Sequence, residues 1–269
     1  MINSTLAKKQ LKQLYKHYIE DVYGPAGKRK IEINEIIRLI ENPNSKFHTE
    51  TLEKGDEFSV RAADYLGRYP YKIYIYRHFP HILRAMAKKG NGVKVLEVGS
   101  FLGKEVRGIK TYLENHGVSE YTVAGVEIEP FHLLIGFLIH NDAPGDYDFY
   151  ICDACNMHGI FSDNHFDYVY SEGLLHSLPK EEDKLIQLKE TRRVLKPGGL
   201  LFGSTQSSRD IPSKEILKQV KMANLLYSSR DGLYSILKEA GFENVVVEEI
   251  KRNKPAKGAI KYKLLFYAR

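Results

Sequence analysis

Residues 93–103, Val-Lys-Val-Leu-Glu-Val-Gly-Ser-Phe-Leu-Gly, decide the fold of this chain of 269 residues. An apolar run leads to a carboxylate, Glu97, and two glycines follow before a helical pattern begins. Thirty residues after Glu97, a second apolar run over residues 121–126 also ends in an acid, Glu127. A strand, a glycine turn, a helix and a second strand that ends in an acid form the opening βαβ unit of a nucleotide-binding sheet.

The ends of these two strands favour a ligand that contains a nucleoside but no phosphate. Glycine lets the backbone approach a ligand closely because it has no Cβ, and an acid after the second strand is placed to accept hydrogen bonds from a ribose diol. Dinucleotide-binding turns use Gly-x-Gly-x-x-Gly and hold a pyrophosphate at a helix N-terminus. Here Glu97 leads the turn, and Phe101 occupies the place of a middle glycine. A carboxylate repels a pyrophosphate but attracts a cation, so charge favours S-adenosylmethionine (SAM), with its ammonium and sulfonium, over NAD.

The rest of the chain continues the alternation of strands and helices. An apolar strand precedes Asp153, and the Pro-Gly-Gly of residues 197–199 is a helix stop and turn. The further strands are expected at residues 166–171, 200–204, 244–250 and 261–268, and the helices between them at residues 180–194 and 232–240. The last two strands are expected to form an antiparallel pair.

Four motifs together carry a resemblance to a known family. In chain order they are VLEVGSFLG, VAGVEIEP, CDA followed by HFDYVYSEGLLHSL, and RRVLKPGGLLFGS. From about residue 93 to residue 269 the chain therefore resembles the class I SAM-dependent methyltransferases. The resemblance implies an α/β fold: a doubly wound, seven-stranded, mostly parallel sheet of the Rossmann-like type, with one reversed strand near the C-terminal edge.

The resemblance also implies which residues bind SAM. Glu97 and the two glycines would hold its methionine end, Glu127 its ribose and Ile128 its adenine, with Asp153 at the exocyclic amine. The expected cofactor-binding residues are Glu97, Gly99, Ser100, Gly103, Glu127, Ile128, Asp153, Ala154 and Ser171.

One departure from the commonest pattern bears on metal binding. Phe101 replaces a glycine, and LEVGSF is similar to the catechol-type O-methyltransferases, which hold a divalent metal through carboxylates. Their metal-binding acids after the fourth strand are not matched by Ser171-Glu172-Gly173, so no metal is expected. The later motifs LLHSL and RRVLKPGG resemble the broad, metal-independent small-molecule group instead.

Two candidate catalytic residues, His176 and Glu172, follow the fourth strand. Ligands of parallel sheets bind beyond the carboxyl ends of the strands, and a histidine there can deprotonate a hydroxyl or orient an acceptor. The alternative is that His176 is a structural residue, since similar histidines occur in family members with different substrates. The motif of Asn or Asp followed by Pro-Pro-Tyr or Pro-Pro-Phe is absent, which argues against methylation of adenine, cytosine or glutamine nitrogens.

Residues 1–90 are predicted to form a helical cap over the mouth of the sheet, ahead of a SAM-binding domain over residues 91–269. Apolar residues recur at helical spacing over residues 5–23 and 31–41, and a third helix is expected over residues 71–89. This segment has 17 Lys and Arg against 10 Asp and Glu. Such a balance suits an RNA-binding appendage. The basic residues are scattered, however, and no RNA-binding signature accompanies them, so a solvated surface or attraction for an acidic small substrate is favoured.

Cys152 and Cys155 form a Cys-x-x-Cys motif with His158 and His165 nearby. A redox pair or half of a zinc site would use this spacing, but two structural cysteines beside the adenine are the favoured interpretation. No apolar stretch approaches the roughly 20 residues that span a bilayer. The first residues also lack the apolar core of a signal peptide. A cytoplasmic protein is therefore expected.

The sequence thus predicts a SAM-dependent methyltransferase that acts on a small-molecule acceptor without a metal. Two alternatives stay open. One is an RNA or protein methyltransferase that recognises its substrate through the basic N-terminal segment. The other is a non-catalytic subunit that keeps the SAM-binding fold. The acceptor, the methylated atom and the oligomeric state are not predicted.

Overall fold

The computed structural model describes residues 73–128, 147–211, 213, 226–252 and 261–269. These residues belong to two compact units. The first unit contains residues 73–91, 100–128 and 147–151, and the second contains residues 92–99 and the described residues from 152 onward. The helices predicted over residues 5–23 and 31–41 lie outside the described residues.

Seven strands form one sheet in the order β3-β2-β1-β4-β5-β7-β6. The strands are β1 (Val93–Val98), β2 (Tyr121–Glu127), β3 (Asp148–Ile151), β4 (Phe166–Glu172), β5 (Leu195–Gln206), β6 (Val245–Lys251) and β7 (Tyr262–Ala268). β2 pairs with β3, β1 with β4 and β4 with β5 in parallel, whereas β7 runs antiparallel to both β5 and β6. The predicted mostly parallel sheet with one reversed strand is confirmed.

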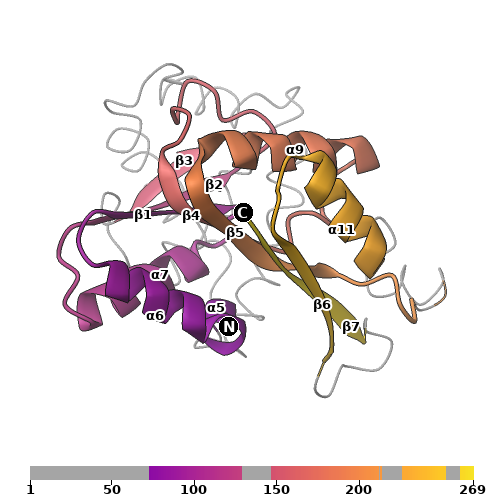
Figure 1. Cartoon of the computed structure of the whole chain (residues 1–269), viewed down its shortest axis with the longest axis horizontal. Helices are drawn as coiled ribbons and strands as arrows, with labels where there is room; N and C mark the ends of the chain where they lie inside the picture. Colours follow the sequence, from indigo (N-terminus) through magenta and orange to yellow (C-terminus); the bar gives the residue numbers. More distant parts are fainter. Residues whose placement is uncertain (1–72, 129–146, 212, 214–225, 253–260) are drawn as a thin grey trace, which may run out of the picture. The chain divides into compact units, whose positions relative to one another are not determined.

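Helices flank the strands in each unit (Figure 1). In the first unit, α5 (Tyr74–His78) and α6 (Pro80–Lys89) pack on α7 (Lys104–Asn115), and α7 packs on β2. In the second unit, α9 (Glu181–Val194) packs on β5, and α11 (Arg230–Glu239) packs on β6 and on α9. None of the helices that the structure describes has both the length and the apolar character needed to cross a membrane.

The single helix predicted over residues 71–89 is two helices in its described part. Pro80 is the first residue of α6, where its missing N–H leaves no hydrogen bond unmade. Phe79, which precedes it, has φ −129° and ψ 38°, outside the helical region. A residue before proline is driven out of the helical conformation by the pyrrolidine ring. The predicted end of the helix at Gly90 is confirmed, with φ 76° there.

β5 also differs from its prediction, because it extends on both sides of residues 200–204. It begins at Leu195, directly after α9, and includes the Pro-Gly-Gly that was expected to be a separate turn. Leu195 pairs with Phe166 of β4, the register then shifts, and regular pairing continues from Leu200 opposite Tyr168. The irregular pairing accommodates the proline and the two glycines within the strand.

The turn between β1 and α7 depends on glycine at its last position, the N-cap of α7. Gly103 has φ 66°, which L residues rarely adopt. A Cβ on Gly103 would lie 2.2 Å from Cζ of Phe149 on β3. Only glycine satisfies both the backbone conformation and this close packing.

Gly103→Ala and Gly117→Ala separate these two requirements. Gly117 has φ 76°, but no atom lies within 4 Å of the position of its Cβ. We expect Gly117→Ala to lower the free energy of unfolding by about 1 kcal/mol, because it forces a left-handed alanine. Gly103→Ala should cost about 3 kcal/mol, because Phe149 must also shift. Urea unfolding of both variants measures the difference, and equal losses would show that packing against Phe149 contributes nothing.

Candidate functional site

In the first unit, the residues that follow β1 are bound to the end of β2. The amide and the hydroxyl of Ser100 both donate to the carbonyl oxygen of Val126, at 2.9 and 3.2 Å. One residue further, the Phe101 amide donates to Oε2 of Glu127 at 2.8 Å. The buried Glu127 carboxylate is therefore fixed at the carboxyl end of β2, beside the glycine turn.

Phe101 has a backbone conformation that its sequence did not predict. Its φ of 51° lies in the left-handed region, which costs a non-glycine residue roughly 1 kcal/mol or more. The hydrogen bond from its amide to Glu127 offsets this cost. Ile128, the next residue after Glu127, is 65% exposed, so an apolar side chain stands open at the end of β2. An exposed isoleucine suits the predicted contact with adenine.

In the second unit, two predicted cofactor residues lie at the end of β1. Glu97 is buried and pairs in register with Tyr170 of β4. Gly99 has φ 70°, and its missing Cβ would lie 3.1 Å from Cβ of Leu174. Glycine at position 99 thus allows the positive φ of the turn and also leaves space for the side chain of Leu174.

Asp153 and Ala154 lie in the loop after β3. Oδ1 of the exposed Asp153 accepts the amide of Cys155 at 2.8 Å, which forms a tight turn. Its second carboxylate oxygen has no partner among the residues that the structure describes. An outward carboxylate beside the buried Ala154 fits the predicted acceptor for the adenine amine.

The chemistry of the two cysteines supports their structural interpretation. Both are free thiols, and burial, with the neighbouring Asp153 and Glu190 carboxylates, raises the pKa of each to about 12. Cys152 donates to the carbonyl oxygens of Asp153 and Asn156, at 3.3 and 3.4 Å. Redox and metal chemistry use the thiolate, which these surroundings disfavour. Within the described part of the chain, no group of three or more His, Cys, Asp or Glu side chains is placed to hold a metal ion.

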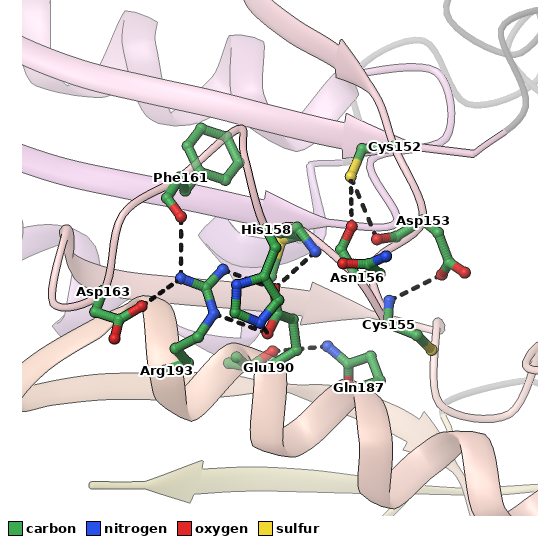
Figure 2. Close-up of polar contacts among 12 residues, drawn as sticks. Cys152, Asp153, Cys155, Asn156, His158, Phe161, Asp163, Gln187, Glu190 and Arg193 are labelled. Carbon is green, nitrogen blue, oxygen red and sulfur yellow. Dashed lines mark hydrogen bonds and ion pairs between the residues drawn. The ribbon is translucent and has the colours of Figure 1, made fainter. Parts of the chain in front are cut away.

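Figure 2 shows how α9 fixes the loop that carries Asp153. Nε and Nη2 of Arg193 donate to the two carboxylate oxygens of Glu190, at 2.8 and 2.7 Å. Nη1 of Arg193 reaches the Phe161 carbonyl oxygen, at 3.0 Å, and Glu190 accepts the Met157 amide, at 2.7 Å. This ion pair, which we call the loop clamp, joins the helix to Met157 and Phe161 in the middle of the loop.

Ser171, near the end of β4, carries a polar atom that the protein leaves unsatisfied. Its hydroxyl is buried and has no hydrogen-bond partner among the described residues. Buried polar atoms in proteins are nearly always paired. The hydroxyl therefore has a hydrogen bond left to make, and its role in binding a cofactor stays a prediction.

Glu172, predicted as a catalytic residue, has both carboxylate oxygens engaged within the protein. Oε1 pairs with the ammonium of Lys263 on β7. Oε2 accepts the hydroxyls of Ser204 at 2.7 Å and Tyr170 at 3.1 Å. A substrate proton would have to displace one of these donors, so the contacts favour a structural role, and the catalytic role stays a prediction. Lys263 was missed because only its position in an otherwise apolar strand marks it in the sequence.

His176, the other predicted catalytic residue, is held by the end of β5. Its Nδ1 accepts the backbone amide of Gln206 at 3.3 Å and lies 3.2 Å from the Thr205 hydroxyl. Since an amide can only donate, Nδ1 is the acceptor and Nε2 carries the proton in the neutral ring. Burial lowers the pKa of His176 to about 4 against the opposing charge of Glu172, so the ring is neutral at pH 7. The geometry suits a donor that orients an acceptor better than a base, a role that stays a prediction.

Comparisons with known proteins agree with this fold. Residues 96–203 match the family described as Methyltransferase domain. Demethylmenaquinone methyltransferase of Staphylococcus carnosus is 32% identical over an alignment that covers 33% of this chain and 45% of that protein. The chain thus spans about half the length of the curated relatives it matches.

Two solved structures share the architecture. One is Haemonchus contortus phosphoethanolamine N-methyltransferase 2 in complex with phosphomonomethylethanolamine and S-adenosylhomocysteine, with a TM-score of 0.52 and 18% identity, covering 70% of this chain and 52% of that one. The other comes from the complex between the Haloferax volcanii Trm112 methyltransferase activator and a putative methyltransferase, with a TM-score of 0.54 and 19% identity, covering 79% and 96%. At these identities the likeness establishes the Rossmann-like methyltransferase fold alone.

Glu190→Gln tests the loop clamp. Glu190 is 7% exposed, and although burial opposes its ionisation, hydrogen bonds from Arg193 and from the Met157 amide lower its pKa. Glutamine keeps an acceptor for Met157 but removes the charge that Arg193 faces. We expect a loss of about 3 kcal/mol in the free energy of unfolding. Asp163→Asn is the matched control, because Asp163 bonds the same arginine but is 67% exposed, and it should cost at most about 1 kcal/mol. Equal losses in denaturant unfolding would contradict the clamp.

The lowered pKa of His176 makes stability depend on pH. Between pH 6.5, the ordinary value, and about pH 4, the unfolded chain binds a proton that the folded protein does not. The neutral His176 therefore contributes about 3 kcal/mol to the free energy of unfolding above pH 6.5, and this contribution is lost as the pH falls to about 4. In His176→Gln the loss of stability on acidification from pH 7 to pH 4 should shrink by that amount, measured by urea unfolding at each pH. An unchanged pH profile would show that the imidazole is not buried as described.

Proposed function

We propose that the protein is a class I SAM-dependent methyltransferase, which transfers a methyl group from SAM to a small-molecule acceptor. The observation that carries the proposal is the family match itself, which begins within β1 and ends within β5. It thus includes the glycine turn, the acid that ends β2 and the loop that carries Asp153.

The described residues fit SAM. The buried hydroxyl of Ser171 lacks a partner within the described residues, and Ile128 presents an open apolar surface. Glu127 is a fixed carboxylate at a strand end, where ribose hydroxyls need an acceptor. We propose that SAM is bound by the residues named from the sequence: Glu97, Gly99, Ser100, Gly103, Glu127, Ile128, Asp153, Ala154 and Ser171.

When bound, SAM supplies a methyl group that is activated by the positive charge of the sulfonium. The protein has to hold an acceptor atom about 3 Å from that carbon and in line with the breaking bond, and to keep water out. Such a reaction needs orientation more than acid–base chemistry. We propose that His176 serves this need through Nε2–H, because its Nδ1 is engaged by Gln206.

A small-molecule acceptor is supported by the names of similar proteins. They include demethylmenaquinone methyltransferases and phosphoethanolamine N-methyltransferase, which by name act on small molecules. We propose in addition that the reaction needs no metal, that residues 1–90 form a cap ahead of a domain over residues 91–269, and that the protein is cytoplasmic.

Transfer of labelled methyl from SAM into a cell extract tests the function. The extract is then separated into small-molecule, nucleic-acid and protein pools, and we expect label in the first. Glu127→Gln should lower the affinity for SAM at least about 10-fold, because a hydrogen bond from the ribose to a charged acceptor is weakened. It should fold normally, because glutamine still accepts the Phe101 amide.

Glu120→Gln is the control, because this exposed acid precedes β2 and should leave SAM binding unchanged. Label in RNA or protein would overturn the small-molecule acceptor in favour of a macromolecular substrate. If no methyl group is transferred and the protein does not bind SAM, the proposal that it is a methyltransferase is wrong.

A further inference from the structure

β6 ends where β7 begins (Figure 1), and three basic residues lie at this place: Lys251, Arg252 and Lys261. Lys251 pairs in register with Tyr262, and the Arg252 amide donates to the carbonyl oxygen of Lys261 at 2.8 Å. Lys251, Arg252 and Lys261 have no carboxylate partner among the described residues. The edge where these strands meet therefore holds positive charge that the described protein does not neutralise.

Arg252 differs from the two exposed lysines because it is half-buried and one buried nitrogen of its guanidinium has no hydrogen-bond partner among the described residues. Nη2 donates to Oε1 of Gln206 at 2.7 Å. Nε is buried and has no hydrogen-bond partner among the residues described. A guanidinium offers five donors in a planar fork that matches carboxylate and phosphate groups. An arginine that is held in place and has one buried donor unsatisfied is suited to bind an anion that is not part of the protein.

The carboxylates of the neighbouring strands are already engaged by other donors. Glu172 forms an ion pair with Lys263. Glu249 on β6 accepts a hydrogen bond from the Ser207 hydroxyl at 2.6 Å and another from Nη1 of Arg209 at 2.9 Å. Neither therefore supplies the missing partner of Arg252. The positive charges of Lys263, Arg252 and Lys184 also help to lower the pKa of His176, after burial and against Glu172. Arg252 thus acts electrostatically on the histidine that follows β4.

One residue connects Arg252 to His176. The Gln206 side chain accepts from Arg252, and the Gln206 backbone amide donates to Nδ1 of His176. Gln206 is buried at the last position of β5, so both contacts start from a fixed point. The guanidinium and the imidazole Nε2–H are thereby held as two donors at the carboxyl end of the same strand.

We propose that the methyl acceptor carries an anionic group, a carboxylate or a phosphate, which Arg252 binds at the ends of β5 and β6 with His176 Nε2–H as a second donor. The inference rests on the proposed function, because it assigns a substrate class to the same enzyme. Gln206 acts as the positioning residue for both donors.

Titration of the full-length protein, in complex with S-adenosylhomocysteine, with inorganic phosphate and with acetate tests this inference. The 15N and 1H chemical shifts of the His176 ring, assigned with His176→Gln, report the binding. We expect saturable shifts with at least one of the two anions. The anion that binds more tightly indicates whether the acceptor carries a phosphate or a carboxylate. Arg252→Gln should weaken this binding at least about 10-fold, because a charge-assisted contact is lost.

Arg209→Gln is the matched control, because Arg209 has the same charge near the end of β5 but is already paired with Glu249. It should leave anion binding unchanged. Equal weakening in the two variants would reveal a response to net charge, and would overturn the proposal. Tight binding of a single-stranded RNA oligonucleotide that both variants lose would overturn it as well, in favour of a nucleic-acid surface.

Calorimetric binding of S-adenosylhomocysteine to the wild type and to Arg252→Gln separates this inference from the proposed function. Both proteins should bind it with the same affinity. If the wild type binds it while neither anion shifts His176, only the anionic acceptor is wrong. If the wild type does not bind it, the proposed function fails first.

Discussion

The turn between β1 and α7 is the constraint on which the rest of the structure depends. Within five residues the backbone enters the left-handed region three times, at Gly99, Phe101 and Gly103. Two of these positions are glycines: a Cβ at Gly103 would overlap Phe149, and a Cβ at Gly99 would lie in tight contact with Leu174. The third is a phenylalanine, whose unfavourable conformation is offset because its amide donates to the carboxylate of Glu127. The acid at the end of β2 thus shapes the turn in addition to any contact with a cofactor.

A second organising feature is the division of charge at the ends of β4, β5, β7 and β6. Glu172 and Lys263 form a largely buried ion pair, and the hydroxyls of Ser204 and Tyr170 donate hydrogen bonds to the same carboxylate. A buried pair of this kind contributes little net stability but is costly to break. Burial lowers the pKa of His176 to about 4 and keeps the ring neutral at pH 7, and Arg252 has no carboxylate partner among the described residues. The same strand ends therefore present hydrogen-bond donors rather than a base.

The part of the fold that local sequence encodes was predicted well. β1, α7 and β2 follow from an apolar run, a glycine turn and a helical period, all within 35 residues. The break at Pro80 could also have been predicted from the sequence, because proline rarely continues a helix. It was not predicted, because apolar residues recur at helical spacing on both sides of the proline. β5 was predicted too short, because the pairing of Leu195 with Phe166 is a tertiary contact that a local glycine signal does not reveal.

The site was predictable in position but not in chemistry. Glu172 and His176 lie after β4, as the topology of a parallel sheet requires, yet their properties come from distant partners. Lys263 is 91 residues from Glu172, and the Gln206 amide is 30 residues from His176. These contacts decide which oxygen or nitrogen atom can still bond to a substrate, and no short sequence motif predicts such contacts. The same holds for Arg252, because the sequence does not reveal that its Nε is buried without a partner among the described residues.

We expect the glycine turn and the acids that follow β1 and β2 to select a cationic nucleoside ligand without a phosphate. The most direct test is calorimetric titration of the purified full-length protein with SAM and, separately, with NAD. The account predicts saturable binding of SAM and no binding of NAD, because a buried carboxylate at the end of β1 repels a pyrophosphate. Binding of NAD in preference to SAM would contradict it.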